Sequence, residues 1–178
     1  MRKVHLLVLA PGLETAAKMG AVPTGNARSI DRTAPPIVRM TNTYIEPGPL
    51  SFAELLQDID HGIYACNGAG GTTMLEMFTF SPASGYRIEG GQLGELVRDF
   101  TLTGNVFQTL HRIDAFGDDF ALPEKFGGCG KGGQVPLPVT FGGPHIRIRD
   151  VVVGHNGMIT ETNLEASAPS DAPCLGAC

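Results

Sequence analysis

The chain has 178 residues, of which 42% are hydrophobic and 17% are charged, and its formal net charge is −5. This size and composition are typical of one folded domain with its own core, and they exclude a wholly disordered protein. The negative charge argues against a nucleic-acid partner, because surfaces that bind phosphate backbones carry clustered Lys and Arg. With 24 glycines and 13 prolines, the composition favours short strands and tight turns over long helices.

The first apolar segment, residues 6–10, is far shorter than the roughly 20 residues that cross a bilayer. We interpret it as a buried strand and expect neither a signal peptide nor contact with a membrane. The four cysteines are Cys66, Cys129, Cys174 and Cys178, and they lack the paired spacing of a zinc ribbon. We therefore expect free thiols and a cytoplasmic protein.

Helix signals occur at three places along the chain. Residues 14–19 predict a short helix that ends at Gly20. Ser51 and Glu54 have the spacing of a capping box and predict the clearest helix, which ends by Gly62. Asn105 can cap a third short helix.

Strand signals cover much of the remaining sequence. Gly90 and Gly91 form a good hairpin turn between two of the predicted strands. The predicted strands are residues 39–45, 62–66, 74–80, 86–89, 96–104 and 145–153. We predict a mainly β member of the α+β class, an antiparallel β-rich domain with two or three short helices over residues 1–154. Residues 155–178 lack periodicity and predict a disordered tail.

The most informative chemical feature is Cys129, which stands among the glycines of residues 127–133 beside Lys131. A nearby lysine favours the thiolate, which binds metals and attacks carbon. The glycines indicate an accessible loop, or simply a run of tight turns. No HExxH or HExxxH motif is present to supply histidine ligands. None of the five histidines forms an i, i+3 or i, i+4 pair, and we expect each, His145 included, on the surface or at a helix end.

The chain contains, in this order, the segments LETAAKMGAVPTGNARS, PPIVRMTNTYIEPG, GIYACNGAGG, GYRIEGGQLGELVRDFTLTGN and GGCGKGGQVPLPV. Together, in this order and spacing, they resemble the C-terminal domain of the TldD/PmbA family, the zinc metallopeptidases also called modulators of DNA gyrase. The resemblance extends over residues 13–154.

The resemblance implies a role for Cys129. In that family, two histidines of an HExxxH helix and a later cysteine in a CGK-x-GQ context hold the catalytic zinc. Here that cysteine is Cys129, in CGKGGQ, so the chain resembles the TldD half of the family. The zinc histidines and the glutamate base match no residue here and would come from a further domain or a partner. The resemblance also implies an unstructured peptide as substrate and a PmbA/TldE-like or identical subunit as partner.

Three functions fit these observations. The first is the C-terminal portion of a TldD-like zinc metallopeptidase subunit, which supplies Cys129 and part of a peptide cleft but is catalytically incomplete alone. The second is a non-catalytic assembly module that pairs with another subunit of the family. The third is an enzyme with Cys129 as nucleophile, which lacks an evident histidine partner.

Overall fold

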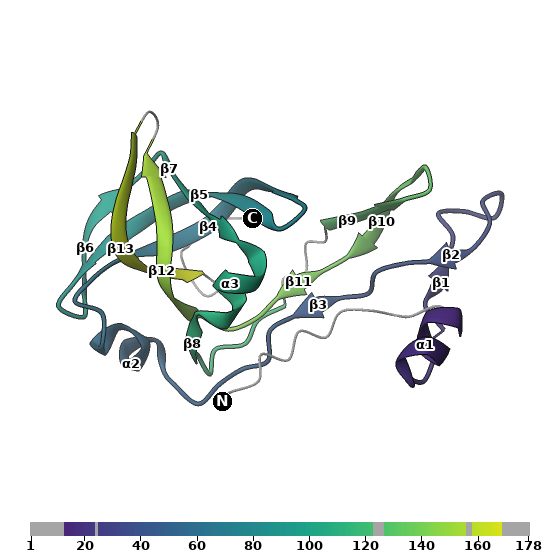
Figure 1. The fold of residues 1–178 in the computed structure, drawn as a ribbon, viewed down its shortest axis with the longest axis horizontal. Helices are drawn as coiled ribbons and strands as arrows, with labels where there is room; N and C mark the ends of the chain where they lie inside the picture. Colours follow the sequence, from purple (N-terminus) through teal and green to yellow (C-terminus); the bar gives the residue numbers. More distant parts are fainter. Residues whose placement is uncertain (1–12, 24, 123–126, 156–157, 169–178) are drawn as a thin grey trace. The chain divides into compact units, whose positions relative to one another are not determined.

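The computed structural model describes residues 13–23, 25–122, 127–155 and 158–168, and its fold is mainly β (Figure 1). Most strand pairs are antiparallel, and the described residues contain three short helices, as predicted. The chain divides into two compact units. We call Glu46–Ala121 with the residues from Gly143 onward the barrel unit. The described residues between 13 and 45, together with those between 122 and 142, form the hairpin unit.

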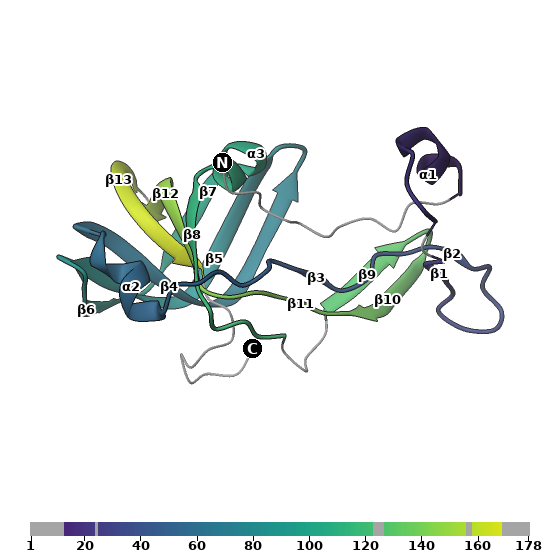
Figure 2. The ribbon, with the colours of Figure 1, turned by 90° about the horizontal axis from the view of Figure 1, so that it is seen from below.

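The barrel unit is a sheet that closes on itself. Its strands are β4 (His61–Met74), β5 (Met77–Glu89), β6 (Gln92–Val97), β7 (Phe100–Asn105), β8 (Ile113–Phe116), β12 (Ile146–His155) and β13 (Met158–Ala168). The order is β13-β4-β5-β7-β12-β8, and β13 also pairs with β12, so five of these strands form a ring. The pairing of β13 with β4 is parallel. Strands β12 and β13, drawn in yellow-green to yellow, lie side by side in both ribbon views (Figure 1 and Figure 2).

Two helices of the barrel unit begin at the predicted caps. Helix α2 (Phe52–Gln57) has Ser51 as N-cap, and both hydrogen bonds of the capping box with Glu54 are present. Helix α3 (Val106–His111) begins after Asn105, whose side chain accepts the backbone N–H of Gln108. Beside α2 lies a buried cluster against which Phe52 and Tyr86 pack. Its members are Leu56, Ile59, Tyr64, Cys66 and Ile88.

Two parts of the barrel unit differ from the sequence-based expectation. The predicted strand over residues 74–80 contains the turn between β4 and β5, where Leu75 has a φ of 54°. Part of the predicted tail, Met158–Ala168, is strand β13, because its backbone pairs with β12 on one side and β4 on the other. Residues 169–178 lie outside the described residues.

The hairpin unit is built from short pairs of strands. Helix α1 (Leu13–Met19) confirms the first predicted helix. Strands β1 (Ala27–Arg28) and β2 (Ile37–Val38) pair antiparallel, as do β9 (Gly127–Lys131) and β10 (Gln134–Val139). Strand β3 (Thr43–Tyr44) pairs in parallel with β11 (Phe141–Gly142). The strand predicted over residues 39–45 is therefore shorter in the structure, where it consists of these two residues of β3.

Some expectations concern the chain as a whole. The strand predicted at residues 6–10 lies outside the described residues. Among the described helices, none has the length and apolar character needed to span a bilayer. Cys129 is a free thiol, as expected, whereas Cys66 is disulfide-bonded, so the expectation was wrong for Cys66.

Candidate functional site

Cys129 lies in strand β9, opposite Leu137 of β10. It is only 9% exposed and packs with Leu137, Val139 and Met40. The expectation of an accessible loop thiol was therefore wrong. The glycines on either side of Cys129 allow β9 and β10 to approach each other closely. A Cβ on Gly128 would stand 2.8 Å from Cβ of Pro136, and one on Gly130 would stand 3.0 Å from Cγ2 of Val135.

The backbone of Cys129 is held by Arg39, whose side chain is 1% exposed. Its Nη2 donates to the carbonyl oxygen of Cys129 and, at 3.0 Å, to the carbonyl oxygen of Gln134. Its Nη1 lies 3.4 Å from Oε1 of Gln134. One guanidinium thus joins the two strands of the hairpin on either side of its turn. Nothing in the spacing of the sequence indicated this contact, which spans 90 residues.

Gln134 and Lys131 connect the hairpin to the preceding loop and strand β2. Oε1 of Gln134 accepts the backbone N–H of Ile30 at 2.8 Å, and Nε2 donates to the carbonyl oxygen of Pro35 at 2.8 Å. Nζ of Lys131 donates to the carbonyl oxygen of Val38 at 2.8 Å. The polar residues of the CGKGGQ segment therefore have structural partners, and Lys131 is anchored although it is exposed.

The electrostatic surroundings of Cys129 favour its thiolate. A hydrogen bond from the Arg39 side chain and one from the backbone N–H of Met40 lower the pKa of the thiol, against the opposing effect of burial. The positive charges of Arg39 and Arg28 act in the same direction. A thiolate is the form of cysteine that binds zinc. The residue is thus suited to serve as one metal ligand.

One ligand does not make a zinc site. Within the part of the chain that the structure describes, no three His, Cys, Asp or Glu side chains gather in a way that could hold a metal ion. A catalytic zinc has three protein ligands and an open position. The donor chemistry of Cys129 fits one of those positions, and the described residues of this chain do not provide the others.

A second polar cluster lies in the barrel unit, around His145. The histidine is 3% exposed, so the expectation of a surface position was wrong. Its Nε2 lies 2.7 Å from Oη of Tyr64, and its Nδ1 contacts Oδ2 of Asp119. Its ring also packs against that of Phe52, with centroids 4.7 Å apart. Sequence reasoning missed this cluster because its members are far apart in the chain.

The surroundings in this cluster shift the pKa values of Tyr64 and Asp119. Burial is the largest cause and the charge of Asp119 is the second, and together they raise the pKa of Tyr64 to about 12. Burial also opposes ionisation of Asp119, but the backbone N–H and the ring of His145 lower the pKa of that carboxyl overall. The phenol is therefore neutral and the carboxylate ionised near neutral pH.

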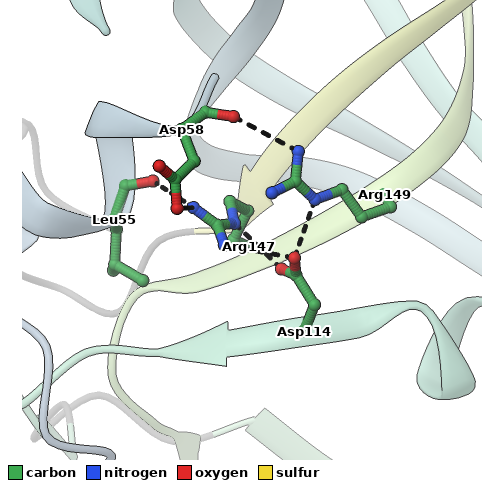
Figure 3. A network of polar contacts seen from close by, with 5 residues as sticks. All are labelled: Leu55, Asp58, Asp114, Arg147 and Arg149. Atoms are coloured by element: carbon green, nitrogen blue, oxygen red, sulfur yellow. Dashed lines mark hydrogen bonds and ion pairs between the residues drawn. The ribbon is translucent and has the colours of Figure 1, made fainter.

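A third network joins α2 to strands β8 and β12 (Figure 3). Arg147 contacts both carboxylate oxygens of Asp114, at 2.9 and 3.1 Å, and donates to the carbonyl oxygen of Leu55 at 3.2 Å. Arg149 contacts the same carboxylate at 2.7 Å and the carbonyl oxygen of Asp58 at 3.4 Å. The two arginines thus satisfy carbonyl groups at the C-terminal end of α2, where a helix has no partners of its own.

Residues 10–155 match the family described as the PmbA/TldA metallopeptidase C-terminal domain. The chain belongs to this PmbA/TldD family. A metalloprotease of Synechocystis is 58% identical over 141 residues, which cover 79% of this chain and 30% of the relative. A zinc metalloprotease TldD homolog of Saccharolobus solfataricus is 37% identical over 78% of this chain and 31% of its own length.

A solved structure agrees with the family assignment. The crystal structure of a modulator of DNA gyrase from Thermotoga maritima has a TM-score of 0.52 at 27% identity, and the match covers 80% of this chain and 29% of that one. The PmbA/TldD chain described here thus spans about a third of the length of the curated relatives it matches.

Proposed function

We propose that this chain is the C-terminal portion of a TldD-like zinc metallopeptidase subunit, in which Cys129 supplies one zinc ligand. The observation that carries the proposal is the environment of Cys129: a free thiol in the CGKGGQ segment whose thiolate form is favoured by Arg39 and Met40. The names of the relatives support a metal-dependent protease, and one of them is named a zinc enzyme.

The chemistry of the proposed site follows from its donor set. A zinc ion with an open position lowers the pKa of bound water to about 7 and polarises a peptide carbonyl. This chain would contribute a negatively charged ligand. Two histidines and a carboxylate base would come from a further domain or another subunit, so the chain is catalytically incomplete alone. A PmbA/TldE-like subunit or a second copy is the proposed partner, in the cytoplasm.

The hairpin also supports a role in peptide binding. Among the described residues, β9 pairs only with β10, so its other edge carries backbone groups without a neighbouring strand. An extended peptide that adds to a sheet edge binds through its main chain with little sequence preference. We include this edge in the proposed cleft for unstructured peptides, because it would bring the substrate backbone close to Cys129.

A fusion of this chain to the remaining part of the Synechocystis relative tests the proposal. The fusion is expected to hold zinc and to hydrolyse an unstructured casein peptide, whereas the chain alone does neither. Cys129→Ser in the fusion is expected to remove most of the zinc and the activity. Leu137→Ala is the matched control, because it alters the packing opposite Cys129 without removing a ligand. Equal zinc content in the Cys129→Ser and unmodified fusions contradicts the proposal.

A non-catalytic assembly module is the second candidate, and the absence of a three-ligand cluster among the described residues favours it. It predicts that the chain binds a PmbA/TldE-like subunit with equal affinity whether position 129 is Cys or Ser. Such binding, together with a fusion that holds no zinc, would establish this candidate instead.

A further inference from the structure

The second half of strand β4 has an edge that is not paired with any described strand. On one side, residues 70–74 pair with β5 in a regular ladder, beyond a bulge between Gly68 and Gly70. On the other side, β13 pairs with β4 only at residues 62–64, so among the described strands none lies beside residues 70–74. Alternate residues of an antiparallel strand direct their N–H and C=O groups away from the partner strand. This edge can therefore bond to another extended chain.

The edge lacks the features that usually prevent such pairing. Proteins commonly protect an exposed strand edge with charged side chains, especially lysine, or with proline. Residues 70–74 contain no charged residue and no proline, and all of them are exposed. Gly71 and Thr73 lie opposite Phe80 and Phe78 of β5, on the same face of the sheet as those rings. The edge is thus open and uncharged, and it carries only small groups on this face.

An apolar groove adjoins the edge. Its volume is about 450 Å³, and residues of β4, β5 and α3 line it. Phe78, Phe80 and Leu110 are among the lining residues, and Gly71 has no side chain to cover the ring opposite it. None of the described residues that line the groove is charged. A pocket of this size with an apolar lining is typical of a site for an apolar group.

Large apolar side chains are also exposed at the turn between β4 and β5 and at the start of α3. These two places are in contact, because the backbone N–H of Val106 donates to the carbonyl oxygen of Glu76 at 2.7 Å. Exposed patches that contain methionine and aromatic side chains are typical of protein interfaces. We therefore infer that the occupant of the groove belongs to a protein. The exposed side chains, each more than half accessible, are Met74, Leu75, Met77 and Phe107.

We propose that residues 70–74 and the groove bind an extended, uncharged segment of a partner protein, whose main chain pairs with β4 and whose large apolar side chain lies in the groove. The unpaired edge selects an extended main chain, and the uncharged lining selects an apolar side chain. A second copy of this edge fits less well, because Gly71 and Thr73 are too small to fill the groove. The site needs neither Cys129 nor a metal ion, so it is separate from the proposed function.

Hydrogen exchange of the full chain, followed by nuclear magnetic resonance, tests this site with a designed peptide. The probe is the uncharged peptide TVTFTVT with blocked ends, which has high strand propensity and one aromatic side chain. It is expected to slow the exchange of outward-facing amides in residues 70–74 by about tenfold or more. A control peptide with N-methyl groups at its central residues lacks donors on both of its edges, and it is expected to cause no slowing.

Substitutions at one exposed position test the groove, with the affinity measured by fluorescence anisotropy of a labelled probe. Thr73→Glu places a charge beside the two rings and is expected to weaken binding by about tenfold or more. Thr73→Val keeps the shape without the charge and is expected to bind as tightly as the wild type. Leu96→Glu is the matched control, because it places the same charge on the exposed strand β6, and it is expected to leave binding unchanged. The backbone spectrum shows whether each variant folds.

Three results would overturn this site. One is an exchange rate in residues 70–74 that the probe leaves unchanged, including the case in which slowing is confined to β9. Another is equal affinity of Thr73→Glu and the wild type, or of the probe and its N-methyl control. The third is protection of residues 70–74 that rises with the concentration of the chain alone, which would assign the edge to a second copy. Cys129→Ser is expected to bind the probe normally, so a failure here leaves the proposed function intact, and the reverse also holds.

Discussion

The barrel unit and the hairpin unit are stabilised by different interactions. In the barrel unit, strands of up to 14 residues pair around an apolar cluster that includes Ile88 and Ile59. In the hairpin unit, strands of two to six residues are joined by side chains that bond to backbone carbonyl groups, chiefly Arg39 and Gln134. The apolar cluster there is limited to Cys129, Leu137 and Val139, with Met40 beside it.

This difference shows how a small fold can combine stability with a reactive group. An apolar core tolerates substitution when its volume is kept, but it raises the pKa of a thiol. A site supported by arginine and amide side chains is more sensitive to single changes, yet it keeps N–H donors beside a sulfur atom. The hairpin unit is suited to hold Cys129 for this reason.

The largest expected effect is the loss of a core side chain. Ile88→Ala removes a fully buried side chain from the barrel unit and is expected to lower the free energy of unfolding by about 3–4 kcal/mol, because a cavity remains. Leu137→Ala in the smaller cluster is expected to cost about 2 kcal/mol. Urea unfolding measures both, and hydrogen exchange locates each effect. Equal losses would mean that the two units have equivalent cores.

A second substitution tests whether breaking a polar network in the barrel unit lowers the free energy of unfolding about as much as removing a core side chain. Arg147→Met leaves Asp114 and the carbonyl oxygen of Leu55 without their main partner and is expected to cost about 3 kcal/mol. Arg149→Met is the matched control, because the side chain of Arg149 is 29% exposed, and its expected cost is about 1 kcal/mol. Urea unfolding measures the stability of both variants. A larger loss of stability for Arg149→Met would show that Arg149, and not Arg147, contributes more to the network.

The Tyr64 phenol gives a pH-dependent measurement in the barrel unit. Its pKa is about 12 in the folded chain against about 10 in an unfolded one. Because the folded pKa is the higher one, the neutral phenol contributes fully to the free energy of unfolding below pH 10. This contribution is lost as the pH rises towards 12. The loss of unfolding free energy is about 2–3 kcal/mol, since each pKa unit corresponds to about 1.4 kcal/mol. Unfolding curves of the wild type and Tyr64→Phe over this range measure it, and identical pH dependence in both would contradict it.

The smallest expected effects come from one glycine in each unit. Gly133 and Gly90 have φ values of +75° and +54°, and neither has an atom within 4 Å of an added Cβ. Replacement of either by alanine is expected to cost about 1 kcal/mol through backbone strain alone. Hydrogen exchange is expected to accelerate in β9 and β10 for Gly133→Ala, and in β5 and β6 for Gly90→Ala. Acceleration throughout both units would show that they open together.

The features that could be predicted from the sequence are those set by neighbouring residues. The capping box of Ser51 and Glu54, the cap at Asn105 and the Gly90–Gly91 turn each depend on a few adjacent positions, and the structure contains all three. Fold class followed from these signals together with the glycine and proline content.

The features that could not be predicted depend on distant residues. Burial of Cys129 requires strand β10 and Met40, and burial of His145 requires Phe52 and Tyr64. The role of Arg39 depends on carbonyl groups at least 90 positions away. Position 129 could be proposed as a ligand only through the family resemblance, because a single cysteine among glycines has no spacing that indicates a metal.

Strand β13 has a consequence for how the domain reaches its final form. The family match ends at residue 155, and β13 begins at Met158. The ring is therefore closed by a segment beyond the matched region, which pairs with both β4 and β12. Without β13, one edge of each of these two strands would have no neighbouring strand and could pair with another chain. Pairing of residues 158–168 is therefore expected to protect the domain from aggregation.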